Sequence, residues 1–252
     1  MEIDAFFQIG KDHKICEDYA SKGSLPFEHV IIADGCSSNE NTDIGSRILV
    51  SITKKNIEKF NPDNHIDFLN TILKESRAIV SLMGLKTNCL NATLLLILVY
   101  QEKIYALIVG DGCLIYKNKN EDISHRIHEY KDNFPFYLNY LNLNVEKKES
   151  LIISNEKNES IEKDFSEIIM YEFNKEDLEW VVISSDGISS FSNSSELYAV
   201  ESVIKNISDF KSFKGDFIQR KMKRIIKNMH KESFCNFDDW SLGGIYIMEN
   251  GE

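Results

Sequence analysis

The sequence lacks any apolar stretch long enough to cross a membrane. Its longest apolar run, LLLILVY from Leu94 to Tyr100, is far shorter than the roughly 20 residues that a spanning helix needs. The first residues, MEIDAFFQIG, also lack a basic segment followed by an apolar stretch, so no signal peptide is expected. These absences predict a cytoplasmic protein without a membrane partner.

An excess of positive charge is also missing. The chain has 29 Lys and Arg residues against 40 Asp and Glu residues, which gives a net charge of −11. Nucleic acids need a basic surface that neutralises their phosphates, so no nucleic-acid partner is expected. An acidic surface also repels phosphorylated ligands at long range, and any phosphate site here therefore needs local cations.

Paired cysteine motifs are absent as well. The five cysteines are odd in number and include no C-x-x-C pair. This pattern favours free thiols in a reducing compartment over a disulfide framework or a zinc knuckle.

No repeat of solenoid length and no Pro-, Gly- or Ser-rich linker divides the 252 residues. The sequence therefore predicts one domain over residues 1–252. Residues 117–175 are polar, and we expect a variable insertion or flap at the surface there, with two strands.

The order of apolar patterns indicates the fold class. Helices are predicted over residues 37–60, with Ser38, Asn41 or Thr42 as cap, and over residues 66–83 and 213–231. Strands are predicted near residues 3–9, 30–33, 94–100, 103–109, 113–120, 180–184 and 242–248. Two helices follow the second strand and a hairpin comes next, so the pattern favours an α+β fold of antiparallel sheets flanked by helices.

Three of the apolar strands end in Asp-Gly, at Asp34, Asp111 and Asp186. Carboxylates gathered in one crevice repel each other unless a cation neutralises them, and oxygen ligands favour Mg²⁺ or Mn²⁺. Glycine after each Asp lets the backbone approach a ligand closely. Two acidic pairs, Glu17-Asp18 and Asp238-Asp239, are further candidates.

Each element also has an ordinary interpretation. Asp111-Gly112 lies between two apolar runs, as a type I′ hairpin turn does. Glu17-Asp18 is by default a solvated pair, and Asp238-Asp239 would serve to cap a turn. The three Asp-Gly strand ends and the two acidic pairs, taken together in this order, are harder to explain by turns alone.

Five blocks of the sequence resemble the metal-dependent protein phosphatases of the 2C type, and most closely their bacterial branch. They occur in family order from about residue 8 to 248 and read GKDHKICEDYA, IIADGCSSNENTDIGSRI, NATLLLILVYQEKIYALIVGDGCLIY, WVVISSDGI and FDDWSLGGIYI. The resemblance implies a four-layer αββα sandwich of two antiparallel β-sheets.

The resemblance also implies a metal centre. Asp34 would bridge two Mn²⁺ or Mg²⁺ ions, with Glu17 and the carbonyl of Gly35 on one of them. The other ligands and roles implied are Asp186 and Asp238 on the second ion, Asp111 with Asp186 on a possible third ion, and Asp18 orienting the attacking water.

By this resemblance, the activity is hydrolysis of phosphoserine and phosphothreonine on a phosphoprotein, and a cognate Ser/Thr kinase is a possible partner. Water shared by two cations would lose its proton and attack phosphorus in line, without a phosphoenzyme.

The chain departs from the family pattern at three places. His13 stands where the broader family has a phosphate-gripping Arg, although the bacterial branch also tends to carry His. Cys36 replaces a His that protonates the leaving group in some members, and Ser37-Ser38 replace two glycines. These departures keep a second hypothesis open, a catalytically weak or inactive 2C-like module that binds or regulates a phosphoprotein.

A third hypothesis is a phosphotransferase of the haloacid-dehalogenase type, in which Asp34 would be the nucleophile. That chemistry normally has a second Asp two residues later, where Cys36 stands, so this hypothesis has the least support.

Overall fold

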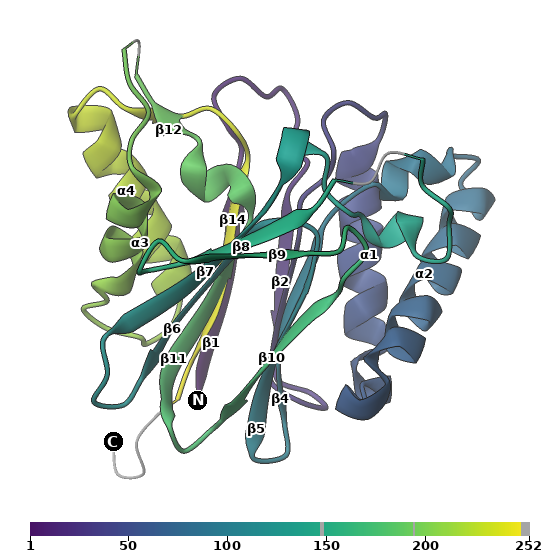
Figure 1. The fold of residues 1–252 in the computed structure, drawn as a ribbon, viewed down its shortest axis with the longest axis horizontal. Helices are drawn as coiled ribbons and strands as arrows, with labels where there is room; N and C mark the ends of the chain where they lie inside the picture. The colour runs from purple at the N-terminus through teal and green to yellow at the C-terminus, as the bar shows by residue number, and fades with distance from the viewer. Residues whose placement is uncertain (147–148, 194, 248–252) are drawn as a thin grey trace.

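The computed structural model describes residues 1–146, 149–193 and 195–247. Within these ranges two antiparallel β-sheets lie face to face, and α-helices cover the outer face of each (Figure 1). The predicted α+β class and the four-layer αββα arrangement are therefore confirmed.

The first sheet has seven strands in the described residues. In spatial order they are β1 (Glu2–Gln8), β14 (Trp240–Tyr246), β11 (Leu178–Ser184), β6 (Gly112–Asn118), β7 (Ile123–Tyr130), β8 (Leu151–Asn155) and β9 (Ser160–Lys163).

The second sheet has five described strands, again all antiparallel. In spatial order they are β10 (Ile169–Asn174), β5 (Lys103–Val109), β4 (Leu94–Tyr100), β3 (His29–Ala33) and β2 (Tyr19–Gly23). A short separate ribbon pairs β12 (Phe191–Ser192) with β13 (Cys235–Asn236).

Among the described residues, two pairs of α-helices form the outer layers (Figure 1). The five-stranded sheet is covered by α1 (Thr42–Lys55) and α2 (His65–Leu82), and the seven-stranded sheet by α3 (Val200–Ser208) and α4 (Phe217–Lys231). Short 3₁₀ helices lie at η1 (Ile57–Lys59), η2 (Pro62–Asn64), η3 (Thr87–Leu90), η4 (Lys131–Asn133), η5 (Leu138–Tyr140) and η6 (Asp186–Ser189). None of the helices in the described ranges is both long and apolar enough to cross a membrane.

The apolar core has three parts, one for each contact between layers. Strand β3 is apolar from Val30 to Ala33 because both of its faces are buried. Val30 and Ile32 pack between the two sheets, whereas Ile31 and Ala33 pack toward α1 and α2. A strand buried on both faces has no polar side to alternate with, which is the pattern that the sequence predicted.

A hydrogen bond also joins the two sheets, between the interior strand β7 of one and the edge strand β10 of the other. His128 on β7 is 1% exposed, and its Nε2 lies 2.9 Å from the hydroxyl oxygen of Tyr171 on β10. Burial lowers the pKa of His128 to about 3, so the ring is neutral in the folded protein at neutral pH.

The hairpin-turn interpretation of Asp111-Gly112 is wrong. Strand β5 belongs to the five-stranded sheet and β6 to the seven-stranded sheet, so the chain crosses between sheets at this point. The crossing needs φ values of +101° at Gly110 and +136° at Gly112, which only glycine adopts readily. Asp111 therefore lies between the layers instead of at an exposed turn.

Two other expectations need correction. The helix predicted over 37–60 spans only Thr42–Lys55. Asn41, one of the predicted cap residues, occupies the N-cap position with φ +62°, but its side chain makes no capping hydrogen bond. The described residues of the segment 117–175 contribute four complete strands, β7 to β10, where two were expected, and they extend both sheets. Whether this segment is a variable insertion of a single domain stays a prediction.

Candidate metal centre

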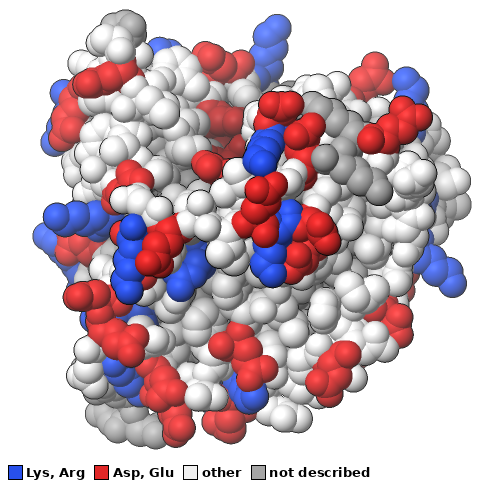
Figure 2. Space-filling view, viewed as in Figure 1, with Lys and Arg blue, Asp and Glu red and all other residues white. Residues whose placement is uncertain are grey.

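An acidic cavity of about 230 Å³ opens where strands of both sheets end. It is lined by Asp34, Gly35, Cys36, Ser37, Ser38, Thr93, Asp111, Asn133, Pro135, Tyr137, Asp186 and Asp238. In Figure 2 acidic side chains gather in a hollow in the upper part of the face shown, beside the region of β12 in Figure 1. The structure thus brings together four carboxylates that lie far apart in the sequence.

Backbone pairing fixes the first of these carboxylates. Asp34 follows β3 directly, and its N–H donates to Thr93 Oγ1 at 3.1 Å, while the N–H of Thr93 donates to the Asp34 carbonyl at 2.8 Å. Gly35 then forms an isolated bridge with Ala92. The loop before β4 therefore holds both Asp34 and the Gly35 carbonyl at the cavity.

Crowding and burial disfavour charge on these groups. Burial, followed by the charges of Asp18 and Asp186, raises the pKa of Asp34 well above its ordinary range. Burial and the charge of Asp186 do the same for Asp111. Burial and Asp186 raise the pKa of Asp238 to about 6. Such a cluster is stable at neutral pH only if protons or a cation neutralise it.

Two carboxylate oxygens in this region have no hydrogen-bond partner among the described residues. They are Asp18 Oδ1 and Asp186 Oδ1, and both are buried. A buried acceptor without a donor is costly, and a divalent cation would satisfy it. The all-oxygen donor set suits Mg²⁺ or Mn²⁺. The residues present therefore fit the metal ions that the sequence implies.

Asp18 lies behind the cavity wall. It is 1% exposed, and its Oδ2 accepts a hydrogen bond of 2.8 Å from Ser185 Oγ. The same Ser185 oxygen accepts from the N–H of Ser241. Burial raises the pKa of Asp18 to about 7. Asp18 is thus oriented by Ser185, directly after β11, and Ser185 is in turn held by Ser241 on β14.

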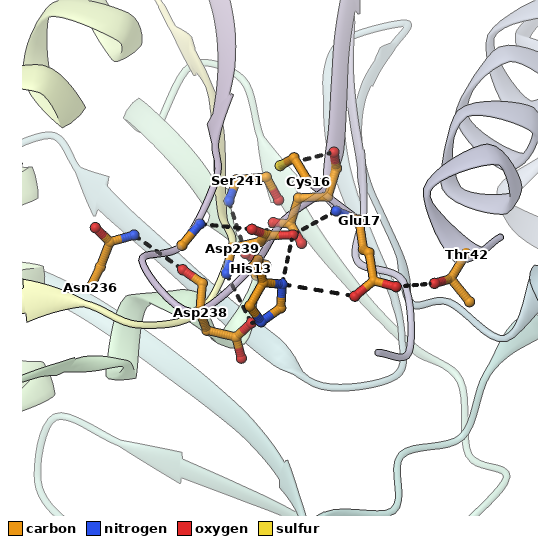
Figure 3. Close-up of polar contacts among 11 residues, drawn as sticks. His13, Cys16, Glu17, Thr42, Asn236, Asp238, Asp239 and Ser241 are labelled. Carbon is orange, nitrogen blue, oxygen red and sulfur yellow. Dashed lines mark hydrogen bonds and ion pairs between the residues drawn. The ribbon is translucent and has the colours of Figure 1, made fainter. Parts of the chain in front are cut away.

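Glu17 lies beside the cavity, next to the start of α1. Its carboxylate accepts a hydrogen bond from Thr42 Oγ1 (Figure 3), and burial raises its pKa. Glu17 does not line the acidic cavity but a neighbouring hollow, and the two share Ser37.

His13 and Asp239 form the link between the N-terminal loop and the last strand (Figure 3). His13 Nδ1 lies 3.2 Å from Asp239 Oδ2, and its Nε2 lies 3.1 Å from Asp238 Oδ1. Both ring nitrogens therefore face carboxylates of the acidic pair. Ligand atoms of His13, Glu17 and Asp239 lie within 4.8 Å of one another, so this group is also able to approach a cation.

The sequence pattern predicts Asp238 as the ligand and no role for Asp239, yet in the structure Asp239 organises the loop. It is 2% exposed, and its carboxylate accepts hydrogen bonds from the N–H groups of Gly10, at 2.7 Å, and Glu17. A Cβ on Gly10 would lie 2.2 Å from the backbone carbon of Asp238, so only glycine fits there. Gly10 in the N-terminal loop and the second acid of the Asp238-Asp239 pair were the only features of the sequence that pointed to this role of Asp239.

Cys36 lies at the cavity in a polar setting. Its N–H donates to the Asn91 carbonyl at 2.9 Å, and its Sγ lies 3.1 Å from Ser38 Oγ. Burial alone would raise the pKa of Cys36, but hydrogen bonds from Ser38, Tyr137 and Asn39 bring it below its ordinary value.

The 117–175 segment supplies a wall of the cavity that the sequence did not reveal at residue level. Asn133, Pro135 and Tyr137 line it, and burial raises the pKa of the Tyr137 hydroxyl. These residues carry no motif, so only the fold could place them.

Comparison with protein families gives one match that spans most of the chain. The model of the family "Protein phosphatase 2C" matches residues 10–227. A search of curated proteins finds no match.

Solved structures share the fold at low sequence identity. A bacterial serine phosphatase is 13% identical, with all of both chains covered and a TM-score of 0.63. PppA of Pseudomonas aeruginosa, described as a key regulatory component of T6SS, is 13% identical over 98% of this chain and 97% of its own, with a TM-score of 0.60. The serine/threonine phosphatase of S. agalactiae is 13% identical over 98% of this chain and 99% of its own, with a TM-score of 0.60.

Proposed function

This chain belongs to the protein phosphatase 2C family, and we propose that it hydrolyses phosphoserine and phosphothreonine on proteins at its acidic cavity. The observation that carries the proposal is the meeting of Asp34, Asp111, Asp186 and Asp238 in one cavity. Four carboxylates from separate segments serve no evident structural purpose at such close quarters, whereas they match the donor set of a Mg²⁺ or Mn²⁺ centre.

The assignment of ligands follows the family pattern. Asp34, the Gly35 carbonyl and Glu17 would hold one ion, and Asp34 with Asp186 and Asp238 would hold a second. Asp111 with Asp186 would hold a possible third. When bound, the cations would supply Lewis-acid stabilisation of charge on the phosphoryl oxygens and lower the pKa of water. The raised pKa values of Asp34, Asp111 and Asp238 support this assignment.

Other groups of the chain would position the reactants. By the family pattern Asp18 would orient the attacking water; its Oδ2 accepts from Ser185, and its buried Oδ1 has no hydrogen-bond donor among the described residues. Tyr137 and Pro135 form part of the cavity wall and exclude solvent from one side. In the reaction the oxygen of water bonds to phosphorus, the ester P–O bond breaks, and the seryl or threonyl oxygen takes up a proton that the attacking water gives up.

A second candidate function is a 2C-like module that binds or regulates a phosphoprotein with little or no turnover. It is favoured by one observation: no Lys or Arg is among the described residues that line the cavity. His13, which stands at the family's phosphate-gripping position, faces Asp238 and Asp239 with both nitrogens. Binding of the substrate phosphate group would then depend on the metal cations alone.

The cellular setting is proposed from the thiols. All five cysteines are free, which suits the reducing cytoplasm. A phosphoprotein substrate implies a kinase that makes it, and a cognate Ser/Thr kinase is therefore the proposed partner.

One assay separates the two candidates. Hydrolysis of p-nitrophenyl phosphate and of a phosphothreonine peptide is measured with Mn²⁺, with Mg²⁺ and with EDTA, for the wild type, Asp34→Asn and Asp186→Asn. Asp122→Asn, at an exposed residue, is the matched control. We expect activity only with metal, a loss of at least about 100-fold in both cavity variants, and no loss in the control. Activity that persists in EDTA refutes a metal-dependent phosphatase, and metal-dependent peptide binding without turnover supports the binding module.

A further inference from the structure

A second pocket, of about 240 Å³, lies on the outer helical layer. We call it the basic pocket, and its lining residues are Phe210, Lys211, Ser212, Phe217, Arg220, Lys221 and Arg224. It is formed by the loop between α3 and α4 together with the first half of α4. The acidic cavity is remote from it, because Asp238 comes after the opposite end of this helix, which at 1.5 Å per residue is roughly 20 Å long.

Four cationic side chains line this pocket in a protein whose net charge is −11. Asp209 faces two of them: its Oδ2 lies 3.3 Å from Arg224 Nη2 and 4.0 Å from Lys221 Nζ. The nearby Asp216 is directed elsewhere, since its carboxylate lies 3.7 Å from Lys22 Nζ. The lining therefore carries an excess of positive charge where the rest of the chain is acidic.

Lys221 is the least exposed of the four cations that line the basic pocket. Its side chain is only 4% exposed, and its Nζ lies 5.3 Å from the centre of the Phe210 ring. Its Nζ also donates to the carbonyl of Asp209. Burial and the charge of Arg224 lower the pKa of Lys221 to about 8. An ammonium group buried beside other cations is unfavourable, and a bound anion would relieve that cost.

We propose that the basic pocket is a binding site for a phosphate group, either free or carried by a small monoester. The guanidinium groups of Arg220 and Arg224 and the ammonium group of Lys221 are the donors that phosphate prefers. Phe210 is half-buried at the pocket and offers an apolar surface to the rest of a monoester. The local cations that an acidic protein needs to hold phosphate are thus found on this outer face.

The ordinary interpretation is that these cations only hold the loop. Arg220 Nη2 donates to the Lys214 carbonyl at 2.6 Å, and Arg224 Nη2 donates to the Asp209 carbonyl at 3.2 Å. A guanidinium has five N–H donors, and these contacts use only some of them. Binding of phosphate is therefore compatible with the loop contacts. The two interpretations differ in whether the pocket binds phosphate.

The test uses the full chain in EDTA, so that no metal centre competes for phosphate. Inorganic phosphate and adenosine monophosphate are titrated calorimetrically into the wild type, Lys221→Met and Arg224→Gln. Lys227→Met, at an exposed position of the same helix outside the pocket, is the matched control. We expect saturable binding with one site in the wild type and the control, weakened about tenfold or more in both pocket variants.

The two ligands distinguish the sources of the phosphate group. Tighter binding of adenosine monophosphate assigns the pocket to a monoester, because Phe210 then contributes, and equal affinity assigns it to free phosphate. Arg224 is 39% exposed, so Arg224→Gln keeps the test decisive if Lys221→Met does not fold. Absence of saturable binding in the wild type, or unchanged affinity in Arg224→Gln, overturns the proposal. Loss of binding in Asp34→Asn would place the phosphate in the acidic cavity and overturn it equally.

Discussion

The carboxylate of Asp239 lies 3.2 Å from Nδ1 of His13 (Figure 3), across 226 positions of sequence. The same carboxylate accepts hydrogen bonds from the backbone N–H groups of Gly10 and Glu17. Asp239 therefore ties the N-terminal loop, which presents Glu17 near the cavity, to the beginning of the last strand.

Replacing Asp239 by Ala should loosen this loop. The N–H groups of Gly10 and Glu17 would lose their acceptor, which should lower the free energy of unfolding by about 2 to 4 kcal/mol. Asp239→Asn keeps one acceptor oxygen and should cost only about 1 kcal/mol. Urea unfolding of the metal-free protein measures both changes. Equal stability of Asp239→Ala and the wild type would contradict the role assigned to Asp239.

The acidic cavity should limit the stability of the metal-free protein. Asp111 is 7% exposed, and the charge of Asp186 opposes its ionisation. Asp111→Asn should therefore raise the free energy of unfolding in EDTA, by about 1 kcal/mol or more, since one pKa unit corresponds to about 1.4 kcal/mol. Saturating Mn²⁺ should stabilise the wild type more than the variant. Asp122→Asn is the control, and a variant less stable than wild type in EDTA would refute the expected repulsion.

A hydrogen-bonded chain connects α2 to the cavity wall. Arg77 Nη2 donates to the Asn139 carbonyl at 2.7 Å, and Asn139 Nδ2 donates to Asn91 Oδ1 at 2.8 Å. The Asn91 carbonyl in turn accepts from the N–H of Cys36. Asn139 is 6% exposed and follows Tyr137 by two residues, so it is placed to position the wall that Tyr137 forms.

Asn139→Ala should therefore affect substrate binding more than the chemical step. We expect KM for a phosphothreonine peptide to rise several-fold, with a smaller change in kcat and in KM for p-nitrophenyl phosphate, and a loss of about 1 to 3 kcal/mol in stability. The matched control is Asn142→Ala, whose exposed amide also reaches α2, at Asn70. A uniform fall in kcat for both substrates would show that Asn139 has no positioning role.

Acid should destabilise the fold through His128. Its pKa is about 3 in the folded protein and 6.5 ordinarily, so between these pH values the unfolded chain binds a proton that the folded chain does not. Stability therefore falls as pH decreases from 6.5 toward 3, by at most about 1.4 kcal/mol per pH unit from this residue. In His128→Gln the dependence of the free energy of unfolding on pH should be weaker by this amount. In His230→Gln, at an exposed position, it should be unchanged. Urea unfolding between about pH 5 and about pH 7 measures the slope, and identical slopes in wild type and His128→Gln would contradict the assignment.

Several features were determined by the sequence itself because they depend on neighbours along the chain. The apolar run of β3, the β4–β5 hairpin and the amphipathic helices α2 and α4 are each encoded by a local periodicity. The Asp-Gly strand ends were equally local, and this is why Asp34 and Asp186 were recognisable as candidates. The α+β class followed from the order of these elements, because short connections restrict how consecutive elements pack.

The tertiary structure alone decided what depends on residues far apart in the sequence. Asp111 lies where the chain crosses between the two sheets and not in a hairpin turn. Asp239 accepts hydrogen bonds from the N–H groups of Gly10 and Glu17. The tertiary structure also brought Tyr137 to the cavity and the cations near Lys221 into one pocket. Burial and electrostatic interaction act through space, so a pattern of neighbours along the chain does not report them.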